Sequence, residues 1–86
     1  MSNSSITVTV KFFAAYQEAY GESEALWEFP EGTVVRRILD RCLAEYPELE
    51  PWERLTRFGV NLQFVSADTI LHDGDEVVLI PPVSGG

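Results

Sequence analysis

Several features that would assign a function are scarce or missing in this sequence of 86 residues. A single cysteine, Cys42, excludes an internal disulfide, which agrees with a reducing compartment. No apolar run approaches the roughly 18 residues that a membrane-spanning helix needs. The first residues, Met1 to Ser5, have neither the basic nor the apolar region of a secretory signal. We therefore expect a cytoplasmic protein that does not enter a membrane.

Basic residues are also few. Six Lys and Arg stand against 14 Asp and Glu, which gives a net charge of −8. Such a surface repels nucleic acid and anionic membranes and favours partners with basic grooves. The same acids would also keep a small domain soluble. The charge therefore excludes classes of partner more than it identifies one.

Motifs for catalysis, cofactors and metals are missing as well. Without a phosphate-binding glycine loop, the chain is not expected to bind ATP itself. The acids Asp73, Asp75 and Glu76 do not follow the spacing of a calcium loop, and a turn that caps a strand explains them. We expect no metal site, no bound cofactor and no independent active site.

Two residues with reactive side chains are predicted to be inert. On a helix, Cys42 would share the face of Leu39 and Leu43, so a buried thiol is favoured over a persulfide carrier. His72 lies in a turn with no cysteine or serine nucleophile nearby in the sequence. It is predicted to be a solvated turn residue.

Hydrophobic periodicity predicts one α+β domain. A period of two indicates strands, and apolar residues at i, i+3, i+4 and i+7 indicate helices. The expected elements are strands at 6–13 and 24–29, a helix at 14–20, a main helix at 34–46 with Thr33 as its N-cap, a minor helix from Pro51 to about Arg57, and strands at 58–61, 64–65 and 76–80. They predict a mixed four- to five-stranded sheet with the main helix across it, a disordered start at 1–5, a domain at 6–80 and an extended tail at 81–86.

The tail is the most informative segment. Pro81 and Pro82 would hold the chain extended and away from the sheet. Gly85 and Gly86 have no Cβ, so they can thread a channel that excludes side chains. An unhindered carboxylate at Gly86 could be activated by one enzyme and delivered to another. The alternative is a frayed terminus without a function, as most C-termini are.

The sheet is apolar on both faces. Val78 and Ile80 lie opposite the expected core face of the last strand, Phe13 ends the outward face of the first strand, and Phe64 is out of phase with its neighbour. A sheet covered by a helix on one side normally carries polar residues on the other. The pattern therefore indicates a docking patch beside the root of the tail. The alternative is that the segment 47–57 folds over this patch and buries it.

These motifs resemble the MoaD/ThiS family of ubiquitin-like sulfur carriers. The similarity runs from about Ile6 to Gly86 and includes Val-Thr-Val-Lys-Phe-Phe-Ala at 8–14, Leu-His-Asp-Gly-Asp-Glu-Val at 71–77 and the final Pro-Pro-Val-Ser-Gly-Gly. The Asp-Gly-Asp-Glu-Val and Gly-Gly pieces are common to both branches of the family. The ending and the helical segment at 14–20 favour the MoaD branch, the small subunits of molybdopterin synthase.

The resemblance implies a β-grasp fold and a cycle of reactions at the tail. An E1-like adenylating enzyme of the MoeB/ThiF type would use Mg-ATP to adenylate Gly86, and a sulfur-donor protein would convert it to a thiocarboxylate. The tail, with Gly85 threading, would then enter a MoaE-like large subunit that supplies the catalytic groups. There the sulfur would pass to cyclic pyranopterin monophosphate, in molybdenum cofactor biosynthesis. A heterotetramer of two small and two large subunits is implied.

The expected partner-binding residues combine the sheet patch with the tail. They are Phe13, Phe64, Val78, Ile80, Pro81, Pro82, Val83 and Ser84. The segment 47–57 does not align with the family pattern, so its contacts stay open. Two alternatives remain: a sulfur carrier for thiazole or tRNA thiolation, and a protein modifier of the archaeal ubiquitin-like type, which has the same ending.

Overall fold

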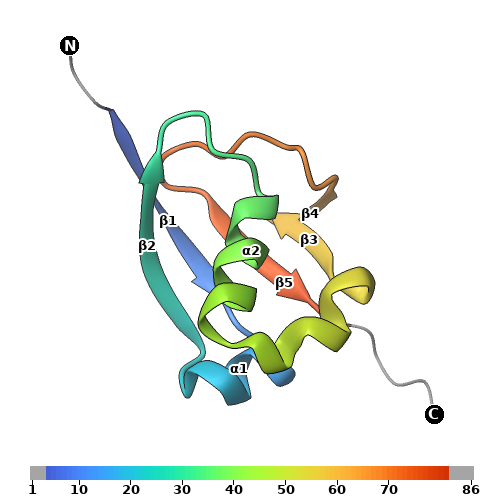
Figure 1. Ribbon diagram of the computed structural model, residues 1–86. Coiled ribbons are helices and arrows are strands. Elements are labelled where there is room, and N and C mark those ends of the chain that lie inside the picture. Colours follow the sequence, from blue (N-terminus) through green and yellow to red (C-terminus); the bar gives the residue numbers. More distant parts are fainter. Residues whose placement is uncertain (1–3, 82–86) are drawn as a thin grey trace.

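One five-stranded mixed sheet organises residues 4–81, the part of the chain that the computed structural model describes. Parallel strands β1 and β5 lie at its centre, and the other neighbouring strands are antiparallel. Figure 1 shows helix α2 (Arg36–Glu45) lying across one face of this sheet. Across the sheet the strands are β2 (Glu24–Pro30), β1 (Ser5–Lys11), β5 (Glu76–Ile80), β3 (Arg57–Val60) and β4 (Gln63–Val65). This arrangement is the β-grasp fold, as expected.

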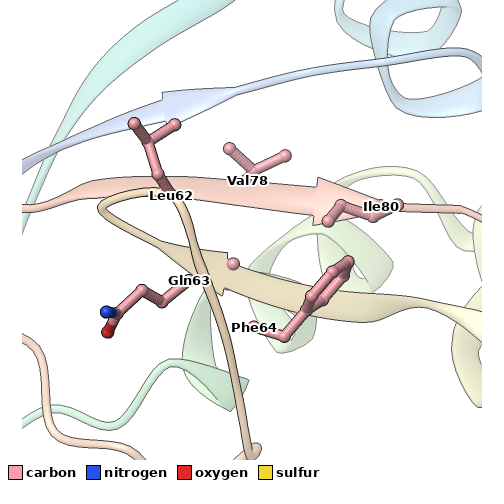
Figure 2. Close-up of a pocket in the computed structure, with 6 residues that line it drawn as sticks. Leu62, Gln63, Phe64, Val78 and Ile80 are labelled. Atoms are coloured by element: carbon pink, nitrogen blue, oxygen red, sulfur yellow. The ribbon is translucent and has the colours of Figure 1, made fainter.

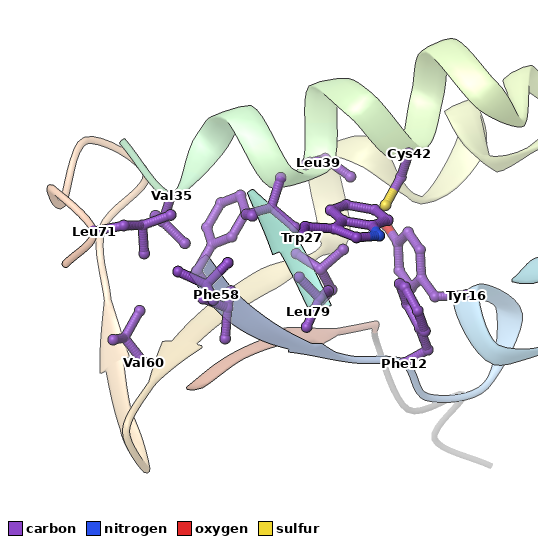
Figure 3. Packing of buried hydrophobic residues seen from close by; sticks show 14 of the residues in the cluster. Phe12, Tyr16, Trp27, Val35, Leu39, Cys42, Phe58, Val60, Leu71 and Leu79 are labelled. Atoms are coloured by element: carbon purple, nitrogen blue, oxygen red, sulfur yellow. The ribbon is translucent and has the colours of Figure 1, made fainter. Parts of the chain in front are cut away.

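The core lies between the inner face of the sheet and α2. Val8 and Val10 of β1 and Val77 and Leu79 of β5 are fully buried there. Figure 3 shows Leu79 among the core side chains and Cys42 pointing from α2 into the core. Each large apolar side chain contributes about 1.5–3 kcal/mol when it leaves water. Buried and more exposed side chains alternate along β1 and β5, so one face of the sheet packs against the core.

A short helix at one end of the sheet confirms the expectation for residues 14–20. Helix α1 (Ala15–Tyr20) follows β1 after the three residues 12–14. Gly21 ends it in the left-handed conformation, with a φ of 73°, and its N–H donates to the Gln17 carbonyl at 2.8 Å. Glycine adopts this φ without the steric cost that a Cβ brings. Strand β1 differs from the expected 6–13 at both ends: it begins at Ser5, within the segment predicted to be disordered, and it ends at Lys11.

The prediction that Thr33 caps the main helix is wrong. The Thr33 hydroxyl donates to the Pro30 carbonyl at 2.6 Å, and α2 begins at Arg36. Val34 instead forms an antiparallel bridge with Ile70, which keeps this stretch extended. The first N–H groups of the helix region, those of Val35 and Arg36, donate to carbonyls of the loop at 67–69, at 2.8 and 3.0 Å. A distant loop thus satisfies donors that a side-chain cap usually serves.

The segment after α2 forms a 3₁₀ helix that begins earlier than the expected Pro51. This helix, η1 (Pro47–Leu55), packs against α2. Leu49 is buried in the core, and the Arg36 guanidinium pairs with the Glu53 carboxylate. The helix η1 therefore lies beside α2.

Candidate functional site

The outer face of the sheet carries the predicted apolar residues. On β5, Val78 and Ile80 point outward and are half-buried, whereas Val77 and Leu79 are fully buried. Gly59 of β3 lies between Val78 on one side and Phe64 of β4 on the other. We call Leu62, Phe64, Val78 and Ile80 the apolar patch.

Gly59 turns the middle of this patch into a hollow. A Cβ on Gly59 would lie 3.6 Å from Ile80 Cδ1 and 3.7 Å from Val78 Cβ. Because glycine leaves that position empty, a hollow of about 160 Å³ opens among the patch residues and Gln63. Figure 2 shows the Phe64 ring beside Ile80 at this hollow. Its size and apolar lining suit a hydrophobic side chain of a docking partner.

The patch is open to solvent. Phe64 is 73% exposed and Leu62 is 91% exposed. Most of the segment 47–57, which was the alternative cover for this face, forms η1 and packs against α2. Exposed apolar side chains that gather on one face are the usual mark of a protein interface. That a partner binds here stays a prediction.

Leu62 belongs to the patch although the sequence analysis missed it. The expected connection at Leu62-Gln63 lies one residue earlier, at Asn61-Leu62, with φ values of 51° and 71°. Two-residue hairpin turns of this kind favour Asn-Gly, because a side chain at positive φ is strained. The signal available in the sequence was an apolar residue where a turn calls for glycine.

The turn is held in place by hydrogen bonds to the start of β5. The Asn61 amide nitrogen donates to Asp75 Oδ1 at 2.9 Å, and its amide oxygen accepts the Glu76 N–H at 3.0 Å. The Asn61 N–H donates to the Glu76 carbonyl at 2.9 Å. Leu62 therefore stands at a fixed position beside Val78.

Phe13 lies apart from the hollow. It is 48% exposed and follows β1, but it does not line the hollow at Gly59. Its carbonyl accepts the Tyr16 N–H at 3.0 Å, and the next residue, Ala14, turns the chain with a φ of 50°. Its proposed contact with a partner stays a prediction.

The root of the tail adjoins the patch. Pro81 follows β5 directly and lines a second hollow, of about 620 Å³, together with Phe64 and Ile80. Leu55 and Thr56 line it as well, and two arginines, Arg54 and Arg57, complete it. The remaining predicted tail residues lie outside the described residues: Pro82, Val83, Ser84, Gly85 and Gly86.

A charged row borders the patch on its other side. Lys11 is the register partner of Val78, and its Nζ lies 3.2 Å from Glu76 Oε2 and 3.8 Å from Glu24 Oε1. Its hydrogen bond and charge interaction with Glu76, and then the charge of Glu24, raise the pKa of Lys11. The ammonium group therefore stays charged and paired, so the outer face changes here from apolar to ionic.

The two reactive side chains that were set aside lie where the sequence predicted, one buried and one exposed. Cys42 is fully buried, and burial raises the pKa of its thiol to about 11. His72 is exposed in its turn, with Nδ1 4.0 Å from Asp75 Oδ2. A neutral buried thiol and a solvated imidazole are poor candidates for nucleophile and base.

The acidic turn also has the structural role that was expected. Asp73 Oδ1 accepts the Thr7 N–H at 2.8 Å, and Asp75 Oδ2 accepts the His72 N–H at 2.8 Å. Among residues 4–81, no group of three or more His, Cys, Asp and Glu side chains is placed to hold a metal ion. No helix in this range is long and apolar enough to span a membrane.

Sequence comparisons agree with the resemblance seen in the motifs. The model of the ThiS family matches residues 10–86. The molybdopterin synthase sulfur carrier subunit of Mycobacterium tuberculosis is 37% identical over 82 residues, which cover 94% of this chain and 99% of that protein. Small archaeal modifier protein 3 of Haloferax volcanii is 28% identical over 88 residues, which cover 90% of this chain and 96% of that protein.

Solved structures give similar matches. A Pyrococcus furiosus protein assigned as molybdopterin converting factor subunit 1 aligns with a TM-score of 0.76 and 30% identity, over 91% of this chain and 99% of that one. A chain in the complex of subunits 1 and 2 of the molybdopterin-converting factor of Helicobacter pylori aligns with a TM-score of 0.61 and 27% identity. That match covers 94% of this chain and 100% of the other.

Proposed function

Because this chain belongs to the ThiS family, we propose that it is the sulfur-carrying small subunit of a molybdopterin synthase. The observation that carries the proposal is the exposed apolar patch, which adjoins the root of a tail that runs to Gly85-Gly86. The patch would dock on a partner while the tail delivers its terminal group. Relatives that match over nearly their whole length, such as the Mycobacterium tuberculosis subunit, support this role.

The chemistry would take place at the carboxylate of Gly86. A carboxylate oxygen is a poor leaving group, so it must be activated before sulfur can replace it. An E1-like adenylating enzyme of the MoeB/ThiF type would use Mg-ATP to form an acyl-adenylate. A sulfur nucleophile from a donor protein would then displace AMP and leave a thiocarboxylate. Two such carriers would supply the two sulfur atoms of the dithiolene made from cyclic pyranopterin monophosphate.

The interior of the domain supports a carrier whose chemistry is confined to the tail. Cys42 is fully buried and its thiol has a raised pKa, so it is ill suited to carry sulfur. Asp73 and Asp75 hold their turn by accepting backbone hydrogen bonds. The acid, base and substrate-binding groups would therefore belong to the large subunit, and Mg-ATP would bind to the adenylating enzyme.

The proposed principal partner is a MoaE-like large subunit. The Helicobacter pylori structure contains both subunits of the molybdopterin-converting factor, which supports pairing of this kind. We propose a heterotetramer of two small and two large subunits in the cytoplasm. The apolar patch, with Phe13, Pro81, Pro82, Val83 and Ser84, would form this chain's side of the contact.

A second candidate function is protein modification. The Haloferax volcanii relative is a small archaeal modifier protein, and this chain has the Gly-Gly end that an isopeptide bond to a lysine would use. Sulfur transfer for thiazole or tRNA thiolation would use the same activated end. All of these functions would begin with adenylation of the Gly86 carboxylate. They differ in the molecule that accepts the sulfur or the acyl group.

Mass spectrometry separates these functions. The full chain, co-expressed with its adenylating enzyme and a sulfur source, should gain the mass difference between sulfur and oxygen at Gly86. It should then form molybdopterin with the large subunit. Deletion of Gly86 should abolish both results, whereas deletion of Ser2 and Asn3 at the other end should leave both intact. Molybdopterin formation by the chain without Gly86 would refute the proposal, and Gly-Gly remnants on cellular lysines, without molybdopterin formation, would favour a modifier.

A further inference from the structure

Two arginines beside the root of the tail stand out in an acidic chain. Within residues 4–81, the ion pairs with carboxylates use Lys11, Arg36 and Arg41 as their arginine or lysine partners. Arg54 and Arg57 are exposed, and neither lies within 4.0 Å of a carboxylate oxygen of this range. Both line the second hollow, which we call the arginine hollow. Arg37 on α2 is likewise outside these ion pairs, so what distinguishes Arg54 and Arg57 within residues 4–81 is that both line the same hollow.

The position of Arg57 is fixed by its neighbour Thr56, a buried residue between η1 and β3. Thr56 is extended, with φ −80° and ψ 132°, and its side chain is buried. Its hydroxyl donates to the Trp52 carbonyl at 2.7 Å and lies 2.5 Å from the Tyr16 hydroxyl. Because neighbouring side chains alternate along an extended chain, Arg57 faces outward when Thr56 faces inward. Arg57 is therefore held in a defined position at the start of β3 by its buried neighbour.

The arginine hollow continues the apolar patch. It shares Phe64 and Ile80 with the hollow at Gly59, and Pro81 completes its wall. The two hollows therefore form one continuous surface, and a partner bound to the apolar patch could also contact the guanidinium groups of Arg54 and Arg57. Elsewhere the outer face carries three acids, Glu24, Glu28 and Glu76, of which Glu24 and Glu76 share one basic partner, Lys11.

We propose that the arginine hollow receives a carboxylate-bearing segment of the large synthase subunit, which fixes the orientation of the small subunit as the tail enters. The inference rests on the proposed function and adds the chemistry of the contact. Charge complementarity supports this occupant, because an acidic segment is attracted to Arg54 and Arg57 and repelled by the acids elsewhere on the face. A guanidinium also binds a carboxylate with two parallel hydrogen bonds, which sets an orientation as well as an affinity.

Binding of the large subunit to single charge-reversal variants tests this inference. Arg54→Glu and Arg57→Glu should each weaken binding about tenfold at low salt, because each places like charges together. The difference from the unchanged chain should shrink as salt rises. Arg37→Glu is the matched control, since Arg37 is exposed on α2 and the change in charge is the same. It should alter binding by less than about twofold. A thermal unfolding curve checks that each variant is folded.

A complementary change on the partner locates the contact. Acid-to-lysine substitutions in the large subunit should include one that restores binding to Arg57→Glu and weakens binding to the unchanged chain. Equal binding by the Arg54, Arg57 and Arg37 variants would overturn the inference. Tighter binding after charge reversal would also overturn it, because the arginines would then hold this chain's own terminal carboxylate.

The failure of this inference differs from the failure of the proposed function. If the unchanged chain binds the large subunit and forms molybdopterin while the arginine variants behave like the control, only the inference fails. If the unchanged chain neither binds the large subunit nor transfers sulfur, the proposed function fails and the inference fails with it.

Discussion

The hydroxyl oxygens of Tyr16 and Thr56 lie 2.5 Å apart in the interior, and this hydrogen bond joins α1 to the residue that precedes β3. Burial raises the pKa of Tyr16, so the phenol stays neutral and can donate. The Thr56 hydroxyl in turn donates to the Trp52 carbonyl at 2.7 Å. The chain of bonds ties three segments together beneath the outward-facing Arg57.

Substitutions of these two residues should differ in cost. Thr56→Val should lower the free energy of unfolding by about 1–3 kcal/mol, because the Tyr16 hydroxyl and the Trp52 carbonyl both lose their partner. Tyr16→Phe should cost about 1 kcal/mol, because Thr56 keeps its bond to Trp52. Chemical denaturation of both variants and the double variant measures these costs. The double variant should lose less than the sum of the single losses; strict additivity would contradict the coupling.

Phe64→Asp should weaken binding to the large subunit by at least about tenfold, because a carboxylate would enter an apolar contact. Titration of the purified large subunit gives the dissociation constant. Leu26→Asp is a close control, since Leu26 is also on the outer face, 72% exposed, and lies outside the patch. Similar dissociation constants for the two variants would mean that the docking surface has been placed on the wrong strands.

Leu62→Gly should raise stability while it weakens docking. Leu62 has a φ of 71°, and relief of this strain by glycine is worth about 1 kcal/mol. Leu62→Ala keeps the strain and removes the apolar contact, so it should weaken docking without a gain in stability. Unfolding curves and binding titrations on both variants separate the two effects. A glycine variant no more stable than the alanine variant would show that the turn is not strained.

Alkaline pH should destabilise the fold in part through Cys42. Burial raises the pKa of this thiol from 9.0 to about 11, so the folded state holds its proton more tightly than the unfolded state. The resulting stability is fully present below pH 9 and is lost as the pH rises through 11. It amounts to at most about 3 kcal/mol, from 1.36 kcal/mol for each pKa unit.

The variant Cys42→Ala isolates that contribution. Its free energy of unfolding should fall less steeply between pH 9 and pH 11 than that of the unchanged chain, even if the cavity left by the substitution lowers stability at every pH. Denaturation curves at several pH values provide the comparison. Parallel slopes for the two chains would show that the thiol does not titrate with unfolding.

The fold could be predicted from the sequence where local patterns and tertiary packing agree. The alternation of Val77, Val78, Leu79 and Ile80 predicted which side chains face the core, and the structure confirms it. The cap at Thr33 could not be predicted correctly, because its competitor is a loop more than thirty residues away. Capping rules consider only acceptors that are near in sequence. Here the N–H groups of Val35 and Arg36 donate to carbonyls of the distant loop at 67–69.

The candidate site was predicted in part, for a related reason. Single residues such as Phe64 and Ile80 were found because their phase within a strand is visible in the sequence. The hollow at Gly59 and the placement of Arg54 and Arg57 beside one hollow could not be predicted. They depend on the order of the strands and on the burial of Thr56, and no single stretch of sequence reveals either. The roles of Gly85 and Gly86 stay predictions, since they depend on a covalent change and on other proteins.

The central position of β5 has a consequence for biosynthesis. Because β5 is made last of the five strands and pairs with both β1 and β3, the halves of the sheet cannot join before residues 76–80 leave the ribosome. A nascent chain that stalls earlier would present two unpaired strand edges, which are prone to aggregate. The complete sheet therefore forms only after β5 has been made.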